Sequence, residues 1–475
     1  MSPPNGGEPE VRVNAWTGGG AAPAGDFGPN WLQWALGEEA GLHKAIFLAP
    51  DAAPDLTVWS DRRVGWGVVL PDRPGLGSEA LATGEDAPEP IRGLIAERKV
   101  ALGRVPIFRP APRNDPRALT FLRDLEANNA PAIDGSPIGV DRGSIPQYLL
   151  LCGSPEEISW ELQYVLSTRR YVGRLDLDAA GLENYVEALL GGWGRSEADV
   201  HRTLTWAVVH PGNDITPLLR DEITSKLHRK LANDDDIGAG ARFLDGRAIS
   251  ADAEVLIEAL AENKPAFVAT SSHGRTEPLD DPDAMAAQLG VLVGQDIESV
   301  DPDALLSRWQ PDGAVWFCHA CCSAGAKKDS SFAGLFDPAG DIGRVLEAAA
   351  ATGDRTSPFP RKLLGAALPL RAFIGQVEPT FDWTLRQPET QQSLTASLVE
   401  PLYRQLFLAK PVGTALESWY GRAATLNQAW LEQRDELSGP GAGAPTKALL
   451  YPRLAAADVA STVLLGDPTA ALPPL

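Results

Sequence analysis

Residues 315–325, VWFCHACCSAG, concentrate the side chains of this chain that are best suited to nucleophilic or metal chemistry. The segment holds three of the four cysteines and one of the six histidines. Thiolates and imidazoles bind metals, exchange disulfides and attack carbonyl carbons, and a free cysteine can also fill a core. Four roles are therefore open: a metal site, a redox pair, a catalytic thiolate, or part of the interior.

The spacing disfavours a metal site and a redox pair. Cys318, His319, Cys321 and Cys322 lie on and just after one predicted strand, where successive side chains point to opposite faces. One strand cannot place four ligands tetrahedrally around zinc, and the fourth cysteine, Cys152, stands alone. Cys318 and Cys321 have the Cys-x-x-Cys spacing of a redox pair. Such a pair usually lies at the start of a helix, whereas Cys318 lies inside the predicted strand. We therefore predict no metal and no cofactor, with Cys318 and Cys152 in the core.

A second motif supplies the base that a catalytic thiolate needs. The apolar run FVATSSHG ends at His273, roughly 50 residues before Cys321, and Gly274 follows it. A thiol nucleophile needs a base that takes its proton and later protonates the leaving amine, and the oxyanion needs N–H donors. If both motifs end parallel strands, they meet at one edge of the sheet. The backbone N–H groups of Gly274 and Cys321 would then hold the oxyanion.

The motifs SSHG and HACCSAG resemble the His-Gly and Ala-Cys motifs of the caspase-like cysteine peptidase superfamily, especially its gingipain-like and CHAT-like bacterial members. His319 stands where caspases have Gln, and two residues separate Cys322 from Gly325, so the similarity is to the wider superfamily. The segments YLLLCGSPEEI, YVGRLDLDAAGLENYVEALL and LLGDPTAAL extend it over about residues 145–470.

The resemblance implies a cysteine endopeptidase that cuts a protein partner through an acyl-enzyme. An alanine directly precedes the nucleophile in the family, which implies Cys321 as the nucleophile rather than Cys322, with His273 as the base. Bacterial relatives often act as triggered proteases in defence or cell-death systems, which implies an activating partner protein. A non-catalytic binding module and a thiol acyltransferase or other hydrolase on the same scaffold remain alternatives.

Two other histidines lie near these motifs in the sequence or at a strand end. His319 is too close to Cys321 in the sequence to meet it across a substrate cleft, so we expect it to be structural or part of a wall of the site. His210 ends the apolar run TWAVVHP, and we expect a capping or surface role rather than a place in the cleft.

A substrate pocket is also implied by the resemblance. Relatives hold the residue before the cut in a pocket whose wall follows the strand after the nucleophile. That strand is RAFIGQV here, and Glu378, Asp382 and Trp383 follow it. Carboxylates at this place would hold Arg or Lys through a charge-assisted contact, with Trp383 as a flat wall. The alternative is that both carboxylates are solvated loop residues.

These groups need a scaffold that brings strand ends together. From the run QYLLLCG onward, predicted strands and helices alternate, which is typical of an α/β protein with a mostly parallel sheet flanked by helices. We predict a first α/β subdomain over 141–262 and a caspase-like catalytic subdomain over 263–440. A tail segment, 441–475, would pack on the catalytic unit. Residues 1–140 would form a smaller mixed N-terminal domain of unknown role, with a helix over 115–128.

The composition of this 475-residue chain argues against several classes of binding partner. Its formal net charge of −21 argues against nucleic acid and anionic membranes as partners. The sequence shows no apolar stretch of about 18 residues that would span a membrane, and the start, MSPPNGGEPE, has no secretory signal. Four cysteines, three of them clustered, cannot form a disulfide framework. We therefore expect a cytoplasmic protein that acts on a protein or peptide.

Overall fold

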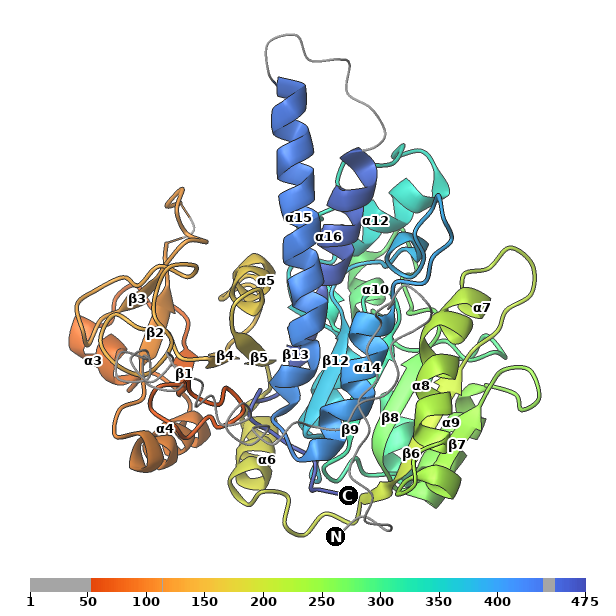
Figure 1. Cartoon of the computed structure of the whole chain (residues 1–475), viewed down its shortest axis with the longest axis horizontal. Coiled ribbons are helices and arrows are strands. Elements are labelled where there is room, and N and C mark those ends of the chain that lie inside the picture. Colours follow the sequence, from red (N-terminus) through yellow and green to blue (C-terminus); the bar gives the residue numbers. More distant parts are fainter. Residues whose placement is uncertain (1–52, 113, 439–448) are drawn as a thin grey trace, which may run out of the picture. The chain divides into compact units, whose positions relative to one another are not determined.

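The computed structural model describes residues 53–112, 114–438 and 449–475, and one compact unit extends from Asp55 to Leu475. The part of the expected N-terminal domain that precedes residue 53 lies outside the described residues. Within the described part, the chain builds an α/β fold around an 11-stranded, mostly parallel sheet (Figure 1). The predicted fold class is confirmed.

The bounds of the strands in this sheet are β1 Trp66–Val69, β2 Ile107–Pro110, β3 Leu122–Asp124, β4 Tyr148–Cys152, β5 Tyr171–Leu175, β6 Asp199–Ala207, β7 Ala241–Leu244, β8 Pro265–Ser271, β9 Val315–His319, β12 Ala372–Gln376 and β13 Thr462–Leu465. They follow the order β3-β2-β1-β4-β5-β13-β12-β9-β8-β6-β7. Two short strands, β10 Gly325–Ala326 and β11 Arg355–Thr356, pair with each other outside this sheet.

The sheet consists of two parallel blocks that run in opposite directions. In the first block β2, β1, β4, β5 and β13 are parallel, and in the second block β12, β9, β8, β6 and β7 are parallel. The blocks meet where β12 pairs antiparallel with β13, and β3 adds an antiparallel strand at one end. All carboxyl ends of the second block therefore lie at the same edge of the sheet, where α/β proteins commonly bind ligands.

The sheet crosses the domain boundaries expected from the sequence. β1 and β2, from the expected N-terminal domain, extend the first block, while β6 and β7, from the expected first subdomain, belong to the second. β13, from the tail segment, lies in the middle of the sheet between β5 and β12. Apolar runs reveal strands, but they do not reveal which strands pair, and long-range pairing decides these boundaries.

The helix expected over 115–128 does not form; this stretch contains turns and β3. β3 pairs antiparallel with β2, so that Asp124 lies opposite Phe108. Asp124 is buried and accepts a hydrogen bond from the guanidinium of Arg104 at 2.7 Å. Tertiary pairing therefore overrides the local helical preference of the segment.

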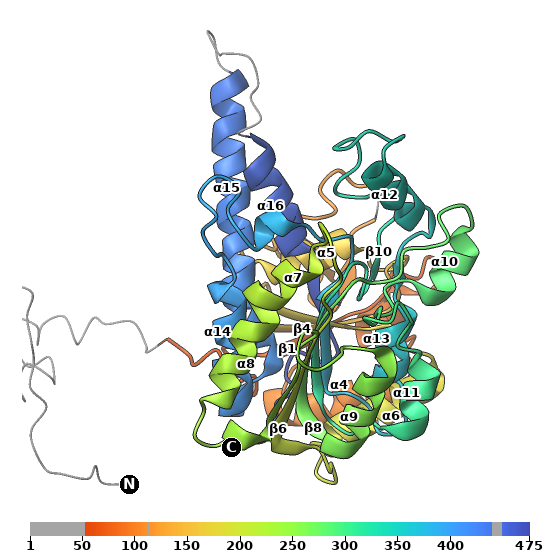
Figure 2. The same ribbon diagram turned by 90° about the vertical axis from the view of Figure 1, so that its right-hand side faces the viewer.

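Helices cover both faces of the sheet, with α6, α9 and α11 on one side and α8, α14 and α15 on the other (Figure 2). The bounds of the helices are α3 Ser78–Thr83, α4 Glu89–Leu102, α5 Trp160–Ser167, α6 Ala179–Leu190, α7 Thr216–Leu219, α8 Ser225–Ala232, α9 Ala253–Asn263, α10 Pro282–Gln288, α11 Pro302–Arg308, α12 Asp341–Ala351, α13 Pro358–Leu364, α14 Ala396–Arg404, α15 Glu417–Ser438 and α16 Leu450–Ala460. A π-helical turn, Arg220–Thr224, joins α7 to α8. None of the helices in the described part combines the length and apolar character that a membrane crossing requires.

Strand β9 is buried on both faces, as expected for a central strand of a parallel sheet. The Trp316 ring packs edge-on against Phe359 of α13, with centroids 5.4 Å apart. Because side chains alternate along a strand, Phe317 and His319 point to the opposite face. This packing fixes the end of β9, from which the turn carrying Cys321 begins.

Candidate active site

The two motifs singled out in the sequence meet at the carboxyl edge of the second block. β8 and β9 are adjacent and parallel, with Ser271 opposite His319. His273 and Cys321 each lie two residues beyond this last pair, so their backbones leave neighbouring strands at the same level. The strand neighbours β6 and β12 also end at this edge. The structure thus places the predicted base and the predicted nucleophile just after the ends of two neighbouring strands.

Glycines permit the close approach of the two strand ends. A Cβ placed on Gly274 would lie 2.0 Å from the carbonyl oxygen of Cys321, closer than any side chain tolerates. A Cβ on Gly290 would lie 1.9 Å from the carbonyl oxygen of Cys322, and Gly290 has φ +70°. Position 274 therefore admits no side chain, because its backbone packs directly against the Cys321 turn.

Within the described part of the chain, neither predicted oxyanion donor, the Gly274 N–H or the Cys321 N–H, donates a hydrogen bond to the backbone of another residue. Gly274 forms an isolated antiparallel bridge with Leu292, in which the flanking His273 and Arg275 make the hydrogen bonds. The Gly274 N–H therefore points away from that segment. The Cys321 N–H lies beside its own sulfur, where it lowers the pKa of the thiol. N–H groups of this kind are what a developing oxyanion requires.

The structure distinguishes Cys321 from the other cysteines. Among the four cysteines, all of which lie in the described ranges, only Cys321 is partly exposed. Cys152 and Cys318 belong to the main hydrophobic core, as predicted. Cys322 is fully buried, in a separate apolar cluster, and has φ +55°. The turn after β9 therefore presents Cys321 and directs Cys322 inward.

The Cys321 thiol stays protonated in this arrangement. Burial raises the pKa of Cys321; the backbone N–H of Thr380, which donates to Sγ at 3.4 Å, lowers it, and the carboxylate of Asp458 raises it again. Within the described part of the chain, no hydrogen bond joins Sγ to His273. Nucleophilic attack therefore needs transfer of the thiol proton to a base.

The imidazole of His273 has an acidic partner that sequence analysis missed. Its Nε2 lies 2.9 Å from Oδ2 of Asp214, in the segment that follows β6. The ring of His210 stacks on the His273 ring, with centroids 5.6 Å apart and an interplanar angle of 17°. His210 therefore lies inside the site, and not in the capping or surface position expected for it. No motif marks Asp214, because only the pairing of β6 with β8 brings it to His273.

His319 occupies a structural position. It is buried, and its Nδ1 lies 3.1 Å from Nε2 of Gln376 on β12. Burial lowers the pKa of His319 to about 4, so its ring is neutral near pH 7. This position agrees with the structural role expected for it.

Of the three predicted pocket residues, Glu378 lies against the Cys321 turn. Its carbonyl oxygen accepts a hydrogen bond from the backbone N–H of Cys322 at 3.3 Å. Its carboxylate is buried, and Oε1 accepts hydrogen bonds from Ser330 Oγ at 2.7 Å and from the Ser331 N–H at 2.9 Å. Oε2 has no hydrogen-bond partner in the described part of the chain.

The other two predicted pocket residues make no contact with Cys321 within the described ranges. Asp382 is exposed at the start of a short 3-10 helix. Trp383 is half-buried and packs toward Tyr451 of α16, with ring centroids 6.4 Å apart.

A second buried carboxylate, Asp458 of α16, was not suggested by the sequence. Its Oδ2 accepts hydrogen bonds from the Phe381 N–H at 3.1 Å and from Thr384 Oγ1 at 2.8 Å. Burial raises the pKa of Asp458 to about 7, although these hydrogen bonds and the charge of Arg422 oppose the rise. A carboxyl group that titrates near neutral pH therefore lies behind the segment that contacts the Cys321 sulfur.

Replacement of Asp458 by asparagine should change how stability depends on pH. In the folded protein the pKa of Asp458 is about 7, whereas in the unfolded chain it is about 3.9. The protonated Asp458 side chain therefore stabilises the fold fully below about pH 3.9, and this contribution is lost as the pH rises through 7. Asp458→Asn removes this titration. As the pH rises from 5 to 8, the unfolding free energy of the variant should therefore increase by about 2 kcal/mol relative to that of wild type. Denaturant unfolding at both pH values checks this, and parallel pH dependences for the two proteins would refute it.

The four cysteines should differ in their reaction with iodoacetamide. Burial raises the pKa of the Cys152 thiol, and Cys152 and Cys318 lie in the core, whereas Cys321 is partly exposed. We expect Cys321 to be alkylated at least about 10-fold faster than Cys152 in the native protein, because accessible thiolate controls the rate. Peptide mapping after timed quenching gives the four rates. Equal rates for the two cysteines would contradict an activated thiol.

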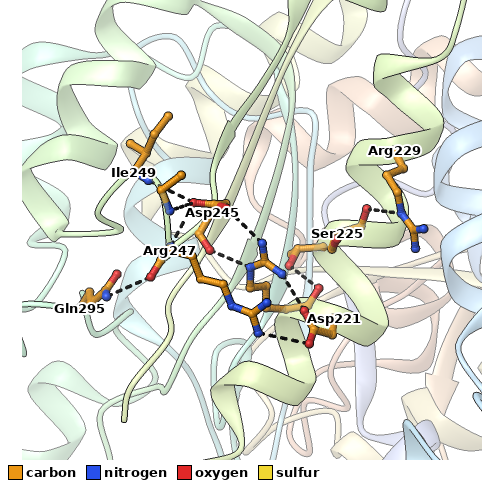
Figure 3. A network of polar contacts seen from close by, with 11 residues as sticks. Asp221, Ser225, Arg229, Asp245, Arg247, Ile249 and Gln295 are labelled. Atoms are coloured by element: carbon orange, nitrogen blue, oxygen red, sulfur yellow. Dashed lines mark hydrogen bonds and ion pairs between the residues drawn. The ribbon is translucent and has the colours of Figure 1, made fainter.

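A polar network braces the loop after β7, the next strand beyond β6 (Figure 3). The Asp245 carboxylate accepts hydrogen bonds from the backbone N–H groups of Arg247, Ala248 and Ile249 and from the guanidinium of Arg220. Partial burial raises the pKa of Asp245, but these donors outweigh it and lower the pKa to about 2. The carboxylate is therefore charged, and it holds the loop, over the whole ordinary pH range.

The same network reaches the segment that supports Gly274. Gln295 donates from Nε2 to the carbonyl oxygen of Gly246 at 3.1 Å (Figure 3). Its Oε1 accepts a hydrogen bond from the Ala251 N–H. Gln295 follows Leu292, which pairs with Gly274. The braced loop therefore fixes the segment on which the His273 motif rests.

No protein-family model matches the chain, and no curated protein matches it.

Proposed function

We propose that this chain is a cysteine endopeptidase of the caspase-like type, with Cys321 as nucleophile and His273 as base. One observation carries the proposal: a partly exposed cysteine and a carboxylate-paired imidazole lie at one sheet edge, together with two backbone N–H groups that bond to no other backbone group in the described residues. Acyl transfer by a thiol needs this combination of nucleophile, base and oxyanion donors. The resemblance of the SSHG and HACCSAG motifs to this superfamily supports the same assignment.

In the proposed reaction, the Cys321 proton moves to His273 and the sulfur bonds to the scissile carbonyl carbon. The carbonyl oxygen becomes an oxyanion that the N–H groups of Gly274 and Cys321 stabilise. The C–N bond breaks, the proton passes from His273 to the leaving amine, and a thioester remains. Water then attacks the thioester and gives a proton to His273; the C–S bond breaks, the sulfur regains that proton, and a carboxylic acid leaves.

The proposed substrate is a protein or peptide, and the proposed compartment is the reducing cytoplasm, where four free cysteines persist. We further propose, from the resemblance, a triggered protease of a bacterial defence or cell-death system that an activating partner protein switches on. The Cys321 sulfur accepts a hydrogen bond from Thr380, and no hydrogen bond joins it to His273 within the described residues. An enzyme that a partner protein activates would form the contact between Cys321 and His273 only after activation.

A proteome-derived peptide library tests this function. The library is incubated with the wild-type protein and with the Cys321→Ala variant, and new termini are identified by mass spectrometry. New termini that need Cys321 support the proposal. Turnover of a thioester or simple amide without peptide cleavage would replace it with an acyltransferase or another hydrolase. Ligand binding without any turnover by the wild-type protein would favour the binding module.

A further inference from the structure

One glutamine of β12, Gln376, contacts the turn after β9 on both sides of Cys321. Its side-chain Oε1 accepts a hydrogen bond from the Ala320 N–H at 3.4 Å, and its backbone carbonyl oxygen accepts one from the Ala324 N–H at 2.7 Å. Its own backbone N–H donates to Ser323 Oγ at 3.0 Å, and the whole residue is buried. These contacts flank the candidate nucleophile, because Ala320 directly precedes it and Ser323 follows it two residues later.

Ser323 packs the turn against the backbone of β12. Its buried hydroxyl accepts the Gln376 N–H and lies 3.3 Å from the Cys318 carbonyl oxygen, to which it donates. A Cβ placed on Gly375 would lie 2.7 Å from this hydroxyl oxygen, so no side chain fits between the strand and the turn. The turn therefore rests directly on residues 375 and 376 of β12.

The partners of the Gln376 side chain fix the orientation of its amide. A backbone N–H only donates, so the amide atom that faces Ala320 is the oxygen. The amide NH2 group then faces Nδ1 of His319 at 3.1 Å and Oγ1 of Thr462 at 3.4 Å. Because this NH2 group donates, Nδ1 of His319 carries a lone pair and the ring proton lies on Nε2. The buried ring of His319 is thus the acceptor that keeps the amide oxygen directed at the turn.

Loss of this amide should loosen the turn and leave β12 paired. The hydrogen bond from the Ala320 N–H to Oε1 needs the side chain of Gln376. The backbone hydrogen bond from Cys322 to the Glu378 carbonyl oxygen, at 3.3 Å, does not need it. A buried N–H group without an acceptor is unfavourable, so the segment around Ala320 would move to find one. Cys321 is the next residue and would move with it.

We propose that Gln376 is a positioning residue, oriented by His319, that holds Ala320 so that the sulfur and the N–H of Cys321 keep the geometry for attack on a carbonyl carbon. The inference rests on the proposed role of Cys321 as nucleophile. A displacement of about 1 Å at a reacting group can lower a rate by about 10²-fold. A loss of this kind falls on kcat rather than on KM, which distinguishes positioning from substrate binding.

The test compares the wild-type protein with Gln376→Met, in which the side chain keeps its length but loses the amide donor and acceptor. Amide hydrogen exchange of residues 319–324, followed by mass spectrometry, should show the Ala320 N–H exchanging at least about 10-fold faster in the variant. On a library-derived peptide, kcat should fall by about 10- to 10²-fold, and KM should change by less than about 3-fold. Heteronuclear NMR of the histidine-labelled wild-type protein should place the His319 proton on Nε2, and a proton on Nδ1 would overturn the amide orientation.

Matched variants separate positioning from a general loss of stability. Gln163 is also a buried glutamine, whose amide donates to the Leu464 carbonyl oxygen at 3.1 Å and accepts from Arg174 at 2.9 Å. Gln163→Met should lower Tm but leave kcat and the exchange of residues 319–324 at wild-type values. Gln376→Glu, kept protonated by burial, again has a donor and an acceptor and should restore both readouts to within about 3-fold of wild type. If Gln376→Met does not fold, Ser323→Ala carries the test, with the same expected shifts in exchange and kcat.

The outcomes distinguish this inference from the proposed function. Exchange and kcat of Gln376→Met, or of folded Ser323→Ala, equal to those of Gln163→Met would overturn the positioning role, and so would faster exchange at an unchanged kcat. The peptidase assignment would then stand on Cys321 and His273. Faster exchange around Ala320 in a chain whose wild type cleaves no peptide would support the hold of Gln376 on the turn and remove the peptidase assignment.

Discussion

Cys321→Ala and His273→Ala should each lower kcat for peptide cleavage by at least about 10⁴-fold, because nucleophile and base act as one unit. In the proposed reaction, Cys321 supplies the sulfur that forms the acyl-enzyme, and His273 moves its proton. The loss should occur without unfolding, since Cys321 is partly exposed and the His273 side chain lies at the mouth of the site. Initial rates on a peptide found in the library digest, with Tm measured in parallel, check both variants.

The neighbouring cysteines provide the matched controls for that loss. Cys322→Ala and Cys318→Ala remove buried sulfurs and should keep kcat within about 10-fold of wild type, with some loss of stability from the cavity left behind. A Cys322→Ala protein that folds but is as inactive as Cys321→Ala would show that the nucleophile is Cys322 or that both thiols are needed.

The second large effect concerns specificity: cleavage should follow Arg or Lys, and Glu378→Gln should reduce kcat/KM for such sites by about 10²-fold. Glu378 lies against the Cys321 turn, and its buried Oε2 has no partner within the described residues, which leaves one carboxylate oxygen for a cation. Glutamine keeps an acceptor for Ser330 and Ser331, so the fold around it should survive. Profiling of both proteins with peptides that vary only before the cut measures the change.

Asp382→Ala is the comparison variant for this prediction. The two carboxylates were equivalent candidates from the sequence, but Asp382 is exposed, so its loss should change kcat/KM by less than about 3-fold. A library cut after Asp or after small apolar residues would remove the acidic pocket and leave the roles of Cys321 and His273 untouched.

The sequence predicts those residues of the candidate site that directly follow a single predicted strand. Cys321, His273 and Gly274 each follow an apolar run directly, so the strand and the chemistry that follows it are read from the same few residues. The order of β8 and β9 in the sheet then confirms that the two runs are neighbours. The burial of Cys152 is predictable for the same reason.

The parts that depend on long-range pairing are not visible in the sequence. Asp214 reaches His273 because β6 pairs with β8, and Asp458 reaches the segment after β12 because α16 returns from the end of the chain. Nothing in the residues around either acid marks it. The reversal of direction between β12 and β13, and the sheet that crosses the expected domain boundaries, follow from the same long-range pairing.

Covalent labelling with a peptidyl acyloxymethyl ketone that carries Arg before the reactive carbon shows whether Cys321 is a nucleophile activated by His273. We expect one adduct per chain, mapped by mass spectrometry to Cys321, retained in Cys322→Ala and lost in both Cys321→Ala and His273→Ala. An adduct on Cys322 or Cys152, or undiminished labelling of Cys321 in the His273→Ala protein, would contradict it.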